Sequence, residues 1–575
     1  MAKPQPQPQL SLASSYLQDT AAGIGFDHWS RRFFERVYCA LDDAQFAPLY
    51  HEGGRVPISP QLLAAITLLQ YMFRVSDAAA VDNTVMRRDW RVALGRDDVW
   101  EGFCPTVLVD FRNRLAGLPI RAGLPPPPGG DQARLIFDAM LQILRDLGLL
   151  RGRRRLRMDA THVVADVARL CRADALQEAI RVLVCELHDR FVELREQADF
   201  VTLHRRFGEE TWLGTGSSGD ERLTALGRDA QALLALCGER EAKAKAVLIQ
   251  MLAENCAFPA DADPQPLENS ERPKDHILTP HEPDVRAGKK GDHWWQGDKV
   301  HIVETADEGQ VNFIVDVVPT DPRVDDSTMT QELVQRAKRA VPEADTMLAD
   351  GGYASATNTR LAAAAGMDLA SRPRGGNRQD KFPPEAFEFD FEREVARCPG
   401  GCESRYWRPR EREITIRFRA SDCRTCPLRD HCTTSKHGRS LGISKDYLQL
   451  VADRRRAQLP EFGELYRHRA PIEATMSHLV RDCGLRRSRY RGRPKRALHS
   501  ILAATALNVR RLLQCPLGEE ASDSRPAVAA TVALFALSAL RTRAAHRAPR
   551  APARPPGPNR RTTRTIRTKF ASKAS

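Results

Sequence analysis

Three acidic residues stand in sequence settings that favour metal-dependent chemistry. Asp159 and Asp350 each follow a short apolar run, as residues at the ends of β-strands do, and Glu473 lies in a polar stretch with helical spacing. Three carboxylates gathered in space can hold two divalent metal ions, which activate the attacking and the leaving oxygen of a phosphodiester. Carboxylate oxygens suit Mg²⁺ or Mn²⁺ better than Zn²⁺. Singly, each acid fits an ordinary exposed carboxylate; together with their flanks, the three predict a site for phosphoryl transfer.

The flanks of these acids resemble motifs of the DDE transposases of bacterial insertion sequences. The strongest matches are Asp159-Ala-Thr, Ala-Asp350-Gly-Gly-Tyr and the spacing of Tyr466, Arg469 and Glu473, which fits the group with a Tyr-x-x-Arg-x-x-x-Glu-x-x-x-x-x-x-Lys signature. The resemblance covers most of the chain, from about residue 26 to about residue 513. It implies that Asp159, Asp350 and Glu473 are catalytic and bind Mg²⁺ or Mn²⁺. It also implies that Tyr466 and Arg469 contact DNA phosphate near the cleaved strand.

The spacing of this signature predicts one helical face, because three and four residues separate Tyr466, Arg469 and Glu473. The signature departs from the family at its last position, where Val480 stands in place of Lys. Arg481 follows directly and is the candidate replacement, although a guanidinium fork and an ammonium point charge are not equivalent at a phosphate.

A basic stretch follows the signature. Residues 486–496 hold seven cations in eleven positions, with Gly and Pro that predict a loop. Such a density of Arg is typical of phosphate binding, and a solvated basic loop is the alternative. The DNA-binding candidates here are Arg486, Arg487, Arg489 and Arg491.

The order of predicted elements around the acids indicates an α/β fold with a mixed sheet. Asp159 ends a strand, two strands and a helix follow, Asp350 ends the next strand, and a helix, a strand and the Glu473 helix complete the series. This order resembles the ribonuclease-H-like fold of DDE recombinases, in which strand ends place side chains at a common crevice. The predicted elements after Asp159 are strands 299–304 and 311–318, helix 325–340, strand 346–349, helix 358–365 and strand 368–371.

Five cysteines between the second and third acids form a separate motif. A C-x-x-C pair with further thiols in reach is the pattern of a tetrahedral zinc site, which would be structural here. An iron–sulfur cluster and reduced thiols without metal are the alternatives. The related transposases have a comparable cluster, and this resemblance favours Cys398, Cys423, Cys426 and Cys432 as ligands of Zn²⁺, with Cys402 as the substitute.

Composition and pattern divide the chain into several regions, as its 575 residues require. We expect a disordered leader at 1–24, an N-terminal helical domain at 25–120, a catalytic domain at 150–515 and a basic disordered tail at 518–575. The catalytic domain would carry a helical insertion at 166–260 and a Cys-rich insertion at 390–445. The resemblance implies DNA binding by the N-terminal domain, and a bundle for packing or dimerisation is the alternative. Its cations that could reach phosphate are Arg87, Arg88, Arg91, Arg112 and Arg114.

The formal charge of +13 is a weak argument for DNA binding, because the tail after residue 540 holds nine Arg, two Lys and no acid. Nucleic-acid contacts must therefore come from local basic patches. The 13 unevenly spaced cysteines favour a reducing cytosol over a secreted disulfide framework. We also expect no signal peptide and no membrane span, and hence a cytoplasmic protein associated with the bacterial nucleoid.

The predicted function is cleavage of DNA at the ends of an insertion sequence and transfer of the freed strands. The expected partners are double-stranded DNA, as terminal repeats and target, and further copies of the chain in a homodimer or larger synaptic complex. Two alternatives remain: a metal-dependent nuclease without strand transfer, and a catalytically decayed transposase that only binds DNA. The Val480 position favours the decayed protein, whereas three intact acids oppose it.

Overall fold

The computed structural model describes residues 24–516, except residue 26 and the segments 52–56, 98–99, 121–123, 209–218, 261, 374–380 and 412. The predicted basic tail and the predicted leader, apart from Ile24, therefore lie outside the described residues. Among the helices of the described part, none is both long enough and apolar enough to cross a membrane.

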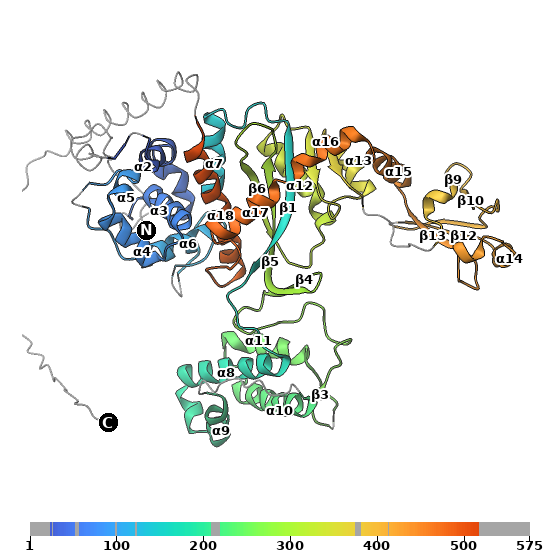
Figure 1. The fold of residues 1–575 in the computed structure, drawn as a ribbon. Helices are drawn as coiled ribbons and strands as arrows, with labels where there is room; N and C mark the ends of the chain where they lie inside the picture. Colours follow the sequence, from blue (N-terminus) through green and yellow to red (C-terminus); the bar gives the residue numbers. More distant parts are fainter. Residues whose placement is uncertain are drawn as a thin grey trace, which may run out of the picture. The chain divides into compact units, whose positions relative to one another are not determined.

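A six-stranded mixed sheet carries two of the three acids. Its strands are β1 (Arg155–Val164), β4 (Arg286–Lys290), β5 (His293–Thr305), β6 (Ile314–Thr320), β7 (Thr346–Ala349) and β8 (Asp368–Ser371). β5 pairs antiparallel with β1, β4 and β6, whereas β7 pairs parallel with both β1 and β8. The sheet is drawn near the middle of Figure 1. This mixed arrangement is that of a ribonuclease-H-like core and confirms the predicted fold class.

Alternating apolar residues explain why β5 and β6 lie at the centre of the core. Val300 and Ile302 of β5 and Val315 and Val317 of β6 are at most 1% exposed. Side chains in a strand alternate between faces, so these residues bury one face of the sheet under the helices. The observed β5 begins earlier than the predicted strand, because residues 293–297 pair with β4 in a hairpin that the sequence did not reveal.

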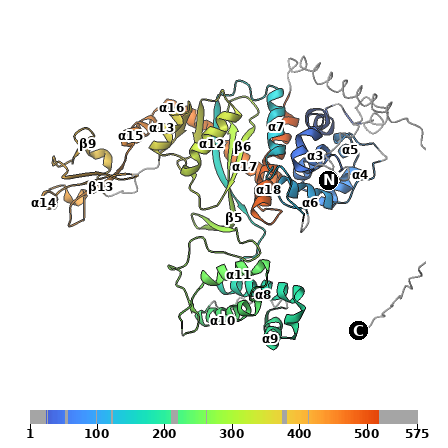
Figure 2. The same cartoon turned by 180° about the vertical axis from the view of Figure 1, so that it is seen from behind.

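Helices from distant parts of the chain cover the sheet. α12 (Asp326–Ala340) packs on β6, α13 (Ala356–Ala364) lies beside β8, α17 (Ile472–Asp482) contacts β1, and α18 (Arg493–Gln514) packs on β6. Figure 2 shows α12 and α13 from behind. The side chain of Asn508 in α18 both accepts from and donates to the backbone of Ile314 in β6. These bonds fix α18 against the strand.

The N-terminal region is helical, as predicted. Its elements are α2 (Trp29–Phe33), η1 (Phe34–Tyr38), η2 (Asp43–Leu49), α3 (Pro60–Phe73), α4 (Asp77–Met86), α5 (Arg88–Ala93) and α6 (Thr106–Leu115), followed by α7 (Leu135–Asp146). The hydroxyl of Ser59 caps α3 by accepting from Leu62 N–H, and Pro60 occupies the first turn. α3 packs against α18, and the buried residues of these helices and of the sheet form one continuous core.

The helical insertion after β1 has its own core. Its elements are α8 (Arg172–Arg190), η3 (Val192–Glu196), α9 (Ala198–Phe207), α10 (Asp220–Cys237), α11 (Lys243–Ala253), β2 (Cys256–Ala257) and β3 (Gln265–Pro266). Apolar residues at helical spacing form the inward face of α8, where Leu176, Ile180, Leu183 and Leu187 are all buried.

The Cys-rich insertion is built from short strands and turns. Its elements are η4 (Pro384–Ala386), β9 (Glu388–Asp390), β10 (Val395–Arg397), β11 (Tyr406–Pro409), β12 (Glu413–Arg417), α14 (Ala420–Arg424), η5 (Arg429–His431), β13 (Ser440–Ser444) and α15 (Tyr447–Arg456). A small cluster of buried side chains, including Ile416, Phe418 and Leu441, is its only core among the described residues of this insertion. Such a small core favours an additional stabilising element such as a metal.

Candidate active site

Asp159 lies within β1, and Asp350 directly follows β7, the strand that pairs parallel with β1. Arg157 of β1 is opposite Leu348 of β7, and each acid stands two residues further along its strand direction. The Asp159 carboxylate accepts from its neighbour's N–H, that of Ala160, at 2.7 Å, and Asp350 accepts from the N–H of Gly352 at 2.7 Å. Burial raises the pKa of Asp159, and the negative charge of Asp350 raises it further. The two carboxylates therefore share one electrostatic environment, which a cation would stabilise.

Arg469 supplies a positive charge between Asp159 and the third acid. Its guanidinium donates to the Asp159 carboxylate at 2.8 Å and lies 3.5 Å from the carboxylate of Glu473. The side chains of Asp159 and Arg469 are 15% and 16% exposed, whereas that of Glu473 is 72% exposed. Asp159 and Arg469, which are 310 positions apart in the sequence, thus form one ion pair. Within the described ranges, no three or more His, Cys, Asp or Glu side chains are gathered as closely as the ligands of one metal ion.

The segment that carries the signature is not one continuous helix. Tyr466 ends α16 (Pro460–Tyr466), Arg469 ends the short helix η6 (Arg467–Arg469), and Glu473 lies in the first turn of α17. The prediction of a single helical face was wrong in this respect. Pro471 has no N–H and precedes α17, so it interrupts the hydrogen-bond ladder. The four-residue spacing of Arg469 and Glu473 is nevertheless preserved as a contact.

Tyr466 lies close to both aspartates. Its hydroxyl donates to the carbonyl of Ala349, the residue before Asp350, at 3.1 Å. The guanidinium of Arg372 lies over its ring, 4.9 Å from the centroid. Burial raises the pKa of Tyr466, and the charges of the two aspartates add to this effect. The tyrosine therefore belongs to the site, and its contact with DNA remains a prediction.

The basic stretch divides into exposed and anchored cations. Arg487, Arg489 and Arg491 are exposed residues. Arg486 is only half-buried, but it donates to the carbonyl of His162 in β1 at 2.7 Å. These four stay predicted DNA contacts, and the anchoring of Arg486 ties the stretch to the strand of Asp159.

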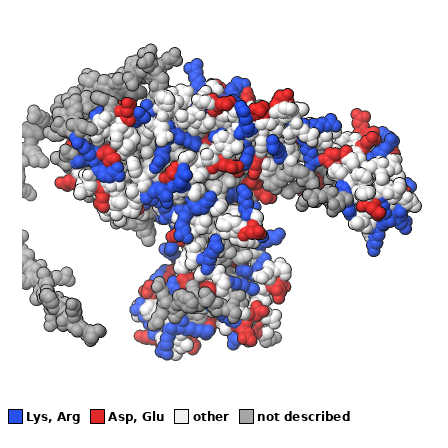
Figure 3. Space-filling model, viewed as in Figure 1, with Lys and Arg blue, Asp and Glu red and all other residues white. Residues whose placement is uncertain are grey.

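Two of the exposed cations have partners nearby. The guanidinium of Arg489 lies over the ring of Tyr71, 5.3 Å from its centroid, and Arg491 is 3.8 Å from the carboxylate of Asp166. Arg481, the candidate replacement for the missing Lys, is 67% exposed and pairs with Asp482 at 3.1 Å. Its role at phosphate stays a prediction. Figure 3 shows basic and acidic side chains interspersed over the face of the molecule seen in Figure 1.

The predicted loop 486–496 was wrong in its second half. α18 begins at Arg493 with proline in its first turn, and Arg496 is 1% exposed. Its guanidinium pairs with the carboxylates of Glu282 and Asp298. The buried cation explains the acid at position 298.

Two arginines of the N-terminal region are also unsuited to phosphate contact. Arg112 is 4% exposed and pairs with Asp77 at 2.6 Å, and Arg114 is 8% exposed and lies over the ring of Tyr50. The interpretation of these two as phosphate contacts or a solvated face was wrong. Their burial could not be predicted, because the sequence pattern of this helix does not show whether an Arg side chain points into the core or toward solvent.

All five thiols of the Cys-rich insertion line one cavity, namely Cys398, Cys402, Cys423, Cys426 and Cys432. Burial raises the pKa of the Cys432 thiol, and crowding by neighbouring thiols adds to it. Gly400 lies over the sulfurs, since a Cβ there would come within 3.1 Å of Cys426 Sγ. The N–H of Arg439 points at Cys423 Sγ from 3.4 Å. Thiols, a glycine and an N–H donor around one cavity are the kinds of group that a thiolate-bound metal uses, although no three of these thiols are as close together as the ligands of one ion.

One buried group near the site was missed from the sequence. Glu304 is 0% exposed and accepts hydrogen bonds from Arg157, Thr475 and Arg511. The sequence around Glu304 gave no sign of this role, because β5 contains several polar residues and the partners of Glu304 come from three distant segments.

Two parts of the chain match known family models. Residues 397–513 match a model described as Transposase DDE domain, and residues 27–114 match one described as Transposase domain (DUF772). The first includes Glu473 and the thiols, and the second covers the N-terminal helices. Searches of curated proteins and of solved structures gave no match.

Proposed function

We propose that this chain, which the two family matches indicate to be an insertion-sequence DDE transposase, cleaves DNA at the ends of its element and transfers the freed strands to target DNA. The observation that supports this best is that Arg469 contacts two of the three acids. Its guanidinium lies between Asp159 and Glu473, and Asp350 follows the strand that pairs parallel with the strand of Asp159.

The donor set suits divalent metal ions. Asp159, Asp350 and Glu473 would hold Mg²⁺ or Mn²⁺, because hard cations prefer carboxylate oxygens. When bound, the metal would activate the attacking oxygen and stabilise the leaving oxygen of the phosphodiester. The raised pKa of Asp159 is consistent with a site that lacks enough positive charge without the metal.

The chain's own residues would hold the DNA and complete the charge balance. Arg469 neutralises Asp159 in the free protein and is free to turn to a phosphate when another cation takes its place. Tyr466 keeps its ring against the strand of Asp350 through the bond to Ala349. The exposed Arg487 and Arg491 offer further phosphate contacts beside the site. Double-stranded DNA is the proposed partner, in a complex of two or more chains.

A strand-joining assay tests the proposal. The purified chain is mixed with its flanking element ends and a supercoiled plasmid, with and without Mg²⁺, beside Glu473→Ala. The proposal expects Mg²⁺-dependent joined products that the variant does not form. Cleavage without joining would replace it by the nuclease alternative, and specific binding without cleavage by the decayed protein.

We also propose that the Cys-rich insertion holds a structural Zn²⁺ through Cys398, Cys423, Cys426 and Cys432. Its small core and the five thiols that line one cavity support this. The test is the zinc content of the purified protein and its release by a thiol reagent, with Cys426→Ser and Cys402→Ser as a matched pair. Only the first should lose the zinc. Equal loss in both, or no zinc in the wild type, would contradict the ligand set.

A further inference from the structure

The segment that presents Glu473 cannot orient itself through helical hydrogen bonds alone. It runs from His468 to Thr475 and contains the end of η6, the junction Ala470–Pro471 and the first turn of α17. A helix keeps its direction through an unbroken ladder of backbone bonds, and this ladder is interrupted at Pro471. The direction of Glu473 relative to the sheet therefore depends on contacts from outside the segment.

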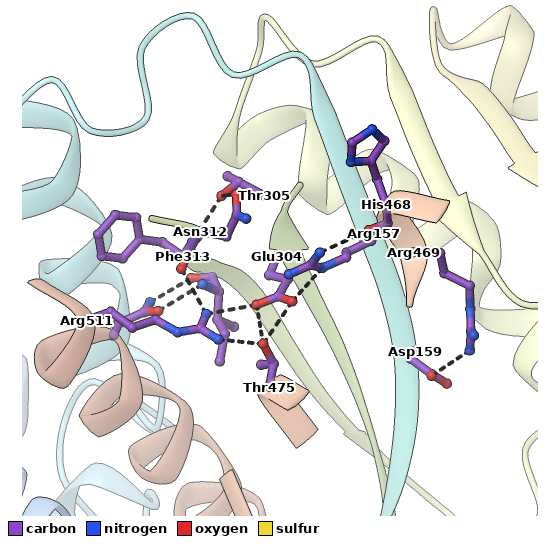
Figure 4. A network of polar contacts seen from close by, with 12 residues as sticks. Arg157, Asp159, Glu304, Thr305, Asn312, Phe313, His468, Arg469, Thr475 and Arg511 are labelled. Atoms are coloured by element: carbon purple, nitrogen blue, oxygen red, sulfur yellow. Dashed lines mark hydrogen bonds and ion pairs between the residues drawn. The ribbon is translucent and has the colours of Figure 1, made fainter. Parts of the chain in front are cut away.

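A single buried carboxylate supplies those contacts. Glu304 at the end of β5 accepts from Arg157 Nε at 2.6 Å, from the hydroxyl of Thr475 at 2.8 and 2.9 Å, and from Arg511 of α18 at 2.8 Å. Figure 4 shows the four side chains converging from β1, β5, α17 and α18. Glu304 is 0% exposed and Thr475 is 2% exposed. A carboxylate buried this completely needs charged partners, and here it has two guanidinium groups.

The network grips the segment at both ends. Arg157, whose Nε is bonded to Glu304, donates from Nη1 to the carbonyl of His468 at 2.9 Å. His468 directly precedes Arg469. At the other end Thr475, two residues after Glu473, is held by Glu304 directly and also accepts from Arg511. Arg469, which pairs with Asp159, and Glu473, which pairs with Arg469, thus lie between two anchored positions.

The position of Glu304 on the sheet makes the anchor rigid. Glu304 is directly opposite Arg157 in the antiparallel register of β1 and β5, and Arg157 is two residues before Asp159. Arg511 also donates to the carbonyl of Asn312 at 2.9 Å, which ties α18 to the β5–β6 connection. The strand that carries Asp159 and the helix that carries Glu473 therefore share one fixed reference point.

We propose that Glu304, with Arg157, Thr475 and Arg511, is the positioning network that sets Glu473 at its distance from Asp159, so that both acids can bind the same metal site. This inference rests on the proposed function. None of the four residues touches the reacting atoms; they act through the placement of Glu473. Removing residues that orient a metal ligand without binding the metal usually weakens metal affinity by about 10- to 100-fold.

The test is Mn²⁺ affinity, measured by electron paramagnetic resonance on the full chain. Thr475→Val removes the hydroxyl at nearly constant volume, Thr475→Ser retains it, and Glu473→Ala removes the ligand itself. Thr505→Val is the matched control, because Thr505 is 0% exposed and its hydroxyl bonds only to the carbonyl of Ile501 in its own helix among the described residues. Thermal unfolding of each variant shows that it is folded.

The expected result is a loss of Mn²⁺ affinity of about tenfold or more in Thr475→Val, with wild-type affinity in Thr475→Ser and Thr505→Val. Unchanged affinity in a folded Thr475→Val, or an equal loss in Thr505→Val, would overturn the inference. If Thr475→Val does not fold, Arg511→Lys serves instead, since it keeps the charge and loses the paired N–H groups. If the wild type does not bind Mn²⁺ in a way that depends on Glu473, the proposed function itself is refuted. If it does, but the Mn²⁺ affinity is unchanged in folded Thr475→Val, only the positioning role is refuted.

Discussion

Replacing Arg469 by Met should strengthen metal binding while it weakens DNA cleavage. In the free protein Arg469 donates to the buried Asp159 at 2.8 Å, so an incoming metal ion must displace it. Met retains an unbranched apolar stem like that of Arg and removes the guanidinium charge. The same arginine is the proposed phosphate contact, so cleavage should fall when it is absent.

The expected gain in Mn²⁺ affinity follows from the free energy of the hydrogen bond between Arg469 and Asp159 that the metal ion displaces. A hydrogen bond to a charged group contributes about 1.5–3 kcal/mol, and each 1.4 kcal/mol is about tenfold in affinity. The second contact, to Glu473, adds little because that side chain is 72% exposed and screened by water. Arg469→Met should therefore bind Mn²⁺ about 10- to 100-fold more tightly near pH 8.

The pH dependence follows from the same ion pair. Burial raises the pKa of Asp159, and the charge of Arg469 opposes that rise. Protons and the metal ion compete for this carboxylate, so Mn²⁺ affinity falls as the pH falls through its pKa. In Arg469→Met the pKa of Asp159 should rise further, so the loss of Mn²⁺ affinity should begin at a higher pH than in the wild type.

The assay is a titration with Mn²⁺ at several pH values, beside cleavage of an element end. Arg467→Met is the control, because Arg467 is 59% exposed and pairs with exposed Glu464. The reasoning is refuted if Arg469→Met binds Mn²⁺ no more tightly than the wild type at pH 8, or if Arg467→Met shows the same gain.

Two further predictions concern the stability of the core. Arg496→Met leaves the buried carboxylates of Glu282 and Asp298 without their cation, so chemical denaturation should show a loss of about 3–5 kcal/mol; a loss below about 1 kcal/mol would contradict the buried pairing. Burial lowers the pKa of His499 to about 4, below the usual value near 6.5, so its contribution to stability is present above about pH 6.5 and is lost as the pH falls toward 4. His499→Gln should lack this part of the acid destabilisation, and identical pH profiles would exclude the role of His499.

The order of the strands and helices around the three acids could be predicted from the sequence. Strands 346–349 and 368–371 were predicted with the bounds that the structure has, because short apolar runs bounded by turn residues leave little ambiguity. A local pattern of apolar residues determines such features, and no distant partner is needed to recognise them. Asp350 follows the end of β7 as predicted, but the prediction that Asp159 ends its strand was wrong, because β1 continues to Val164 in its pairing with β5.

Charged residues that point inward were not predictable from the sequence. Arg496 was assigned to a phosphate-binding loop, yet it is buried between acids from two other segments. Glu304 was assigned to a strand, and its partners lie up to 207 residues away. A cation or an acid in a sequence gives no sign of whether its counter-charge lies in solvent, in DNA or in the core. The interruption at Pro471 was readable in principle, since proline disfavours helix at the residue before it.

The most direct test of the account is cleavage of an element end by Asp350→Asn in Mg²⁺. In the described part of the chain the Asp350 carboxylate has one hydrogen bond, from the N–H of Gly352, which an amide oxygen can equally accept. The change therefore removes a metal ligand and spares the fold. The account predicts that the folded variant still binds the element end and no longer cleaves it. Cleavage at the wild-type rate would contradict the assignment of this carboxylate, and with it the three-acid site.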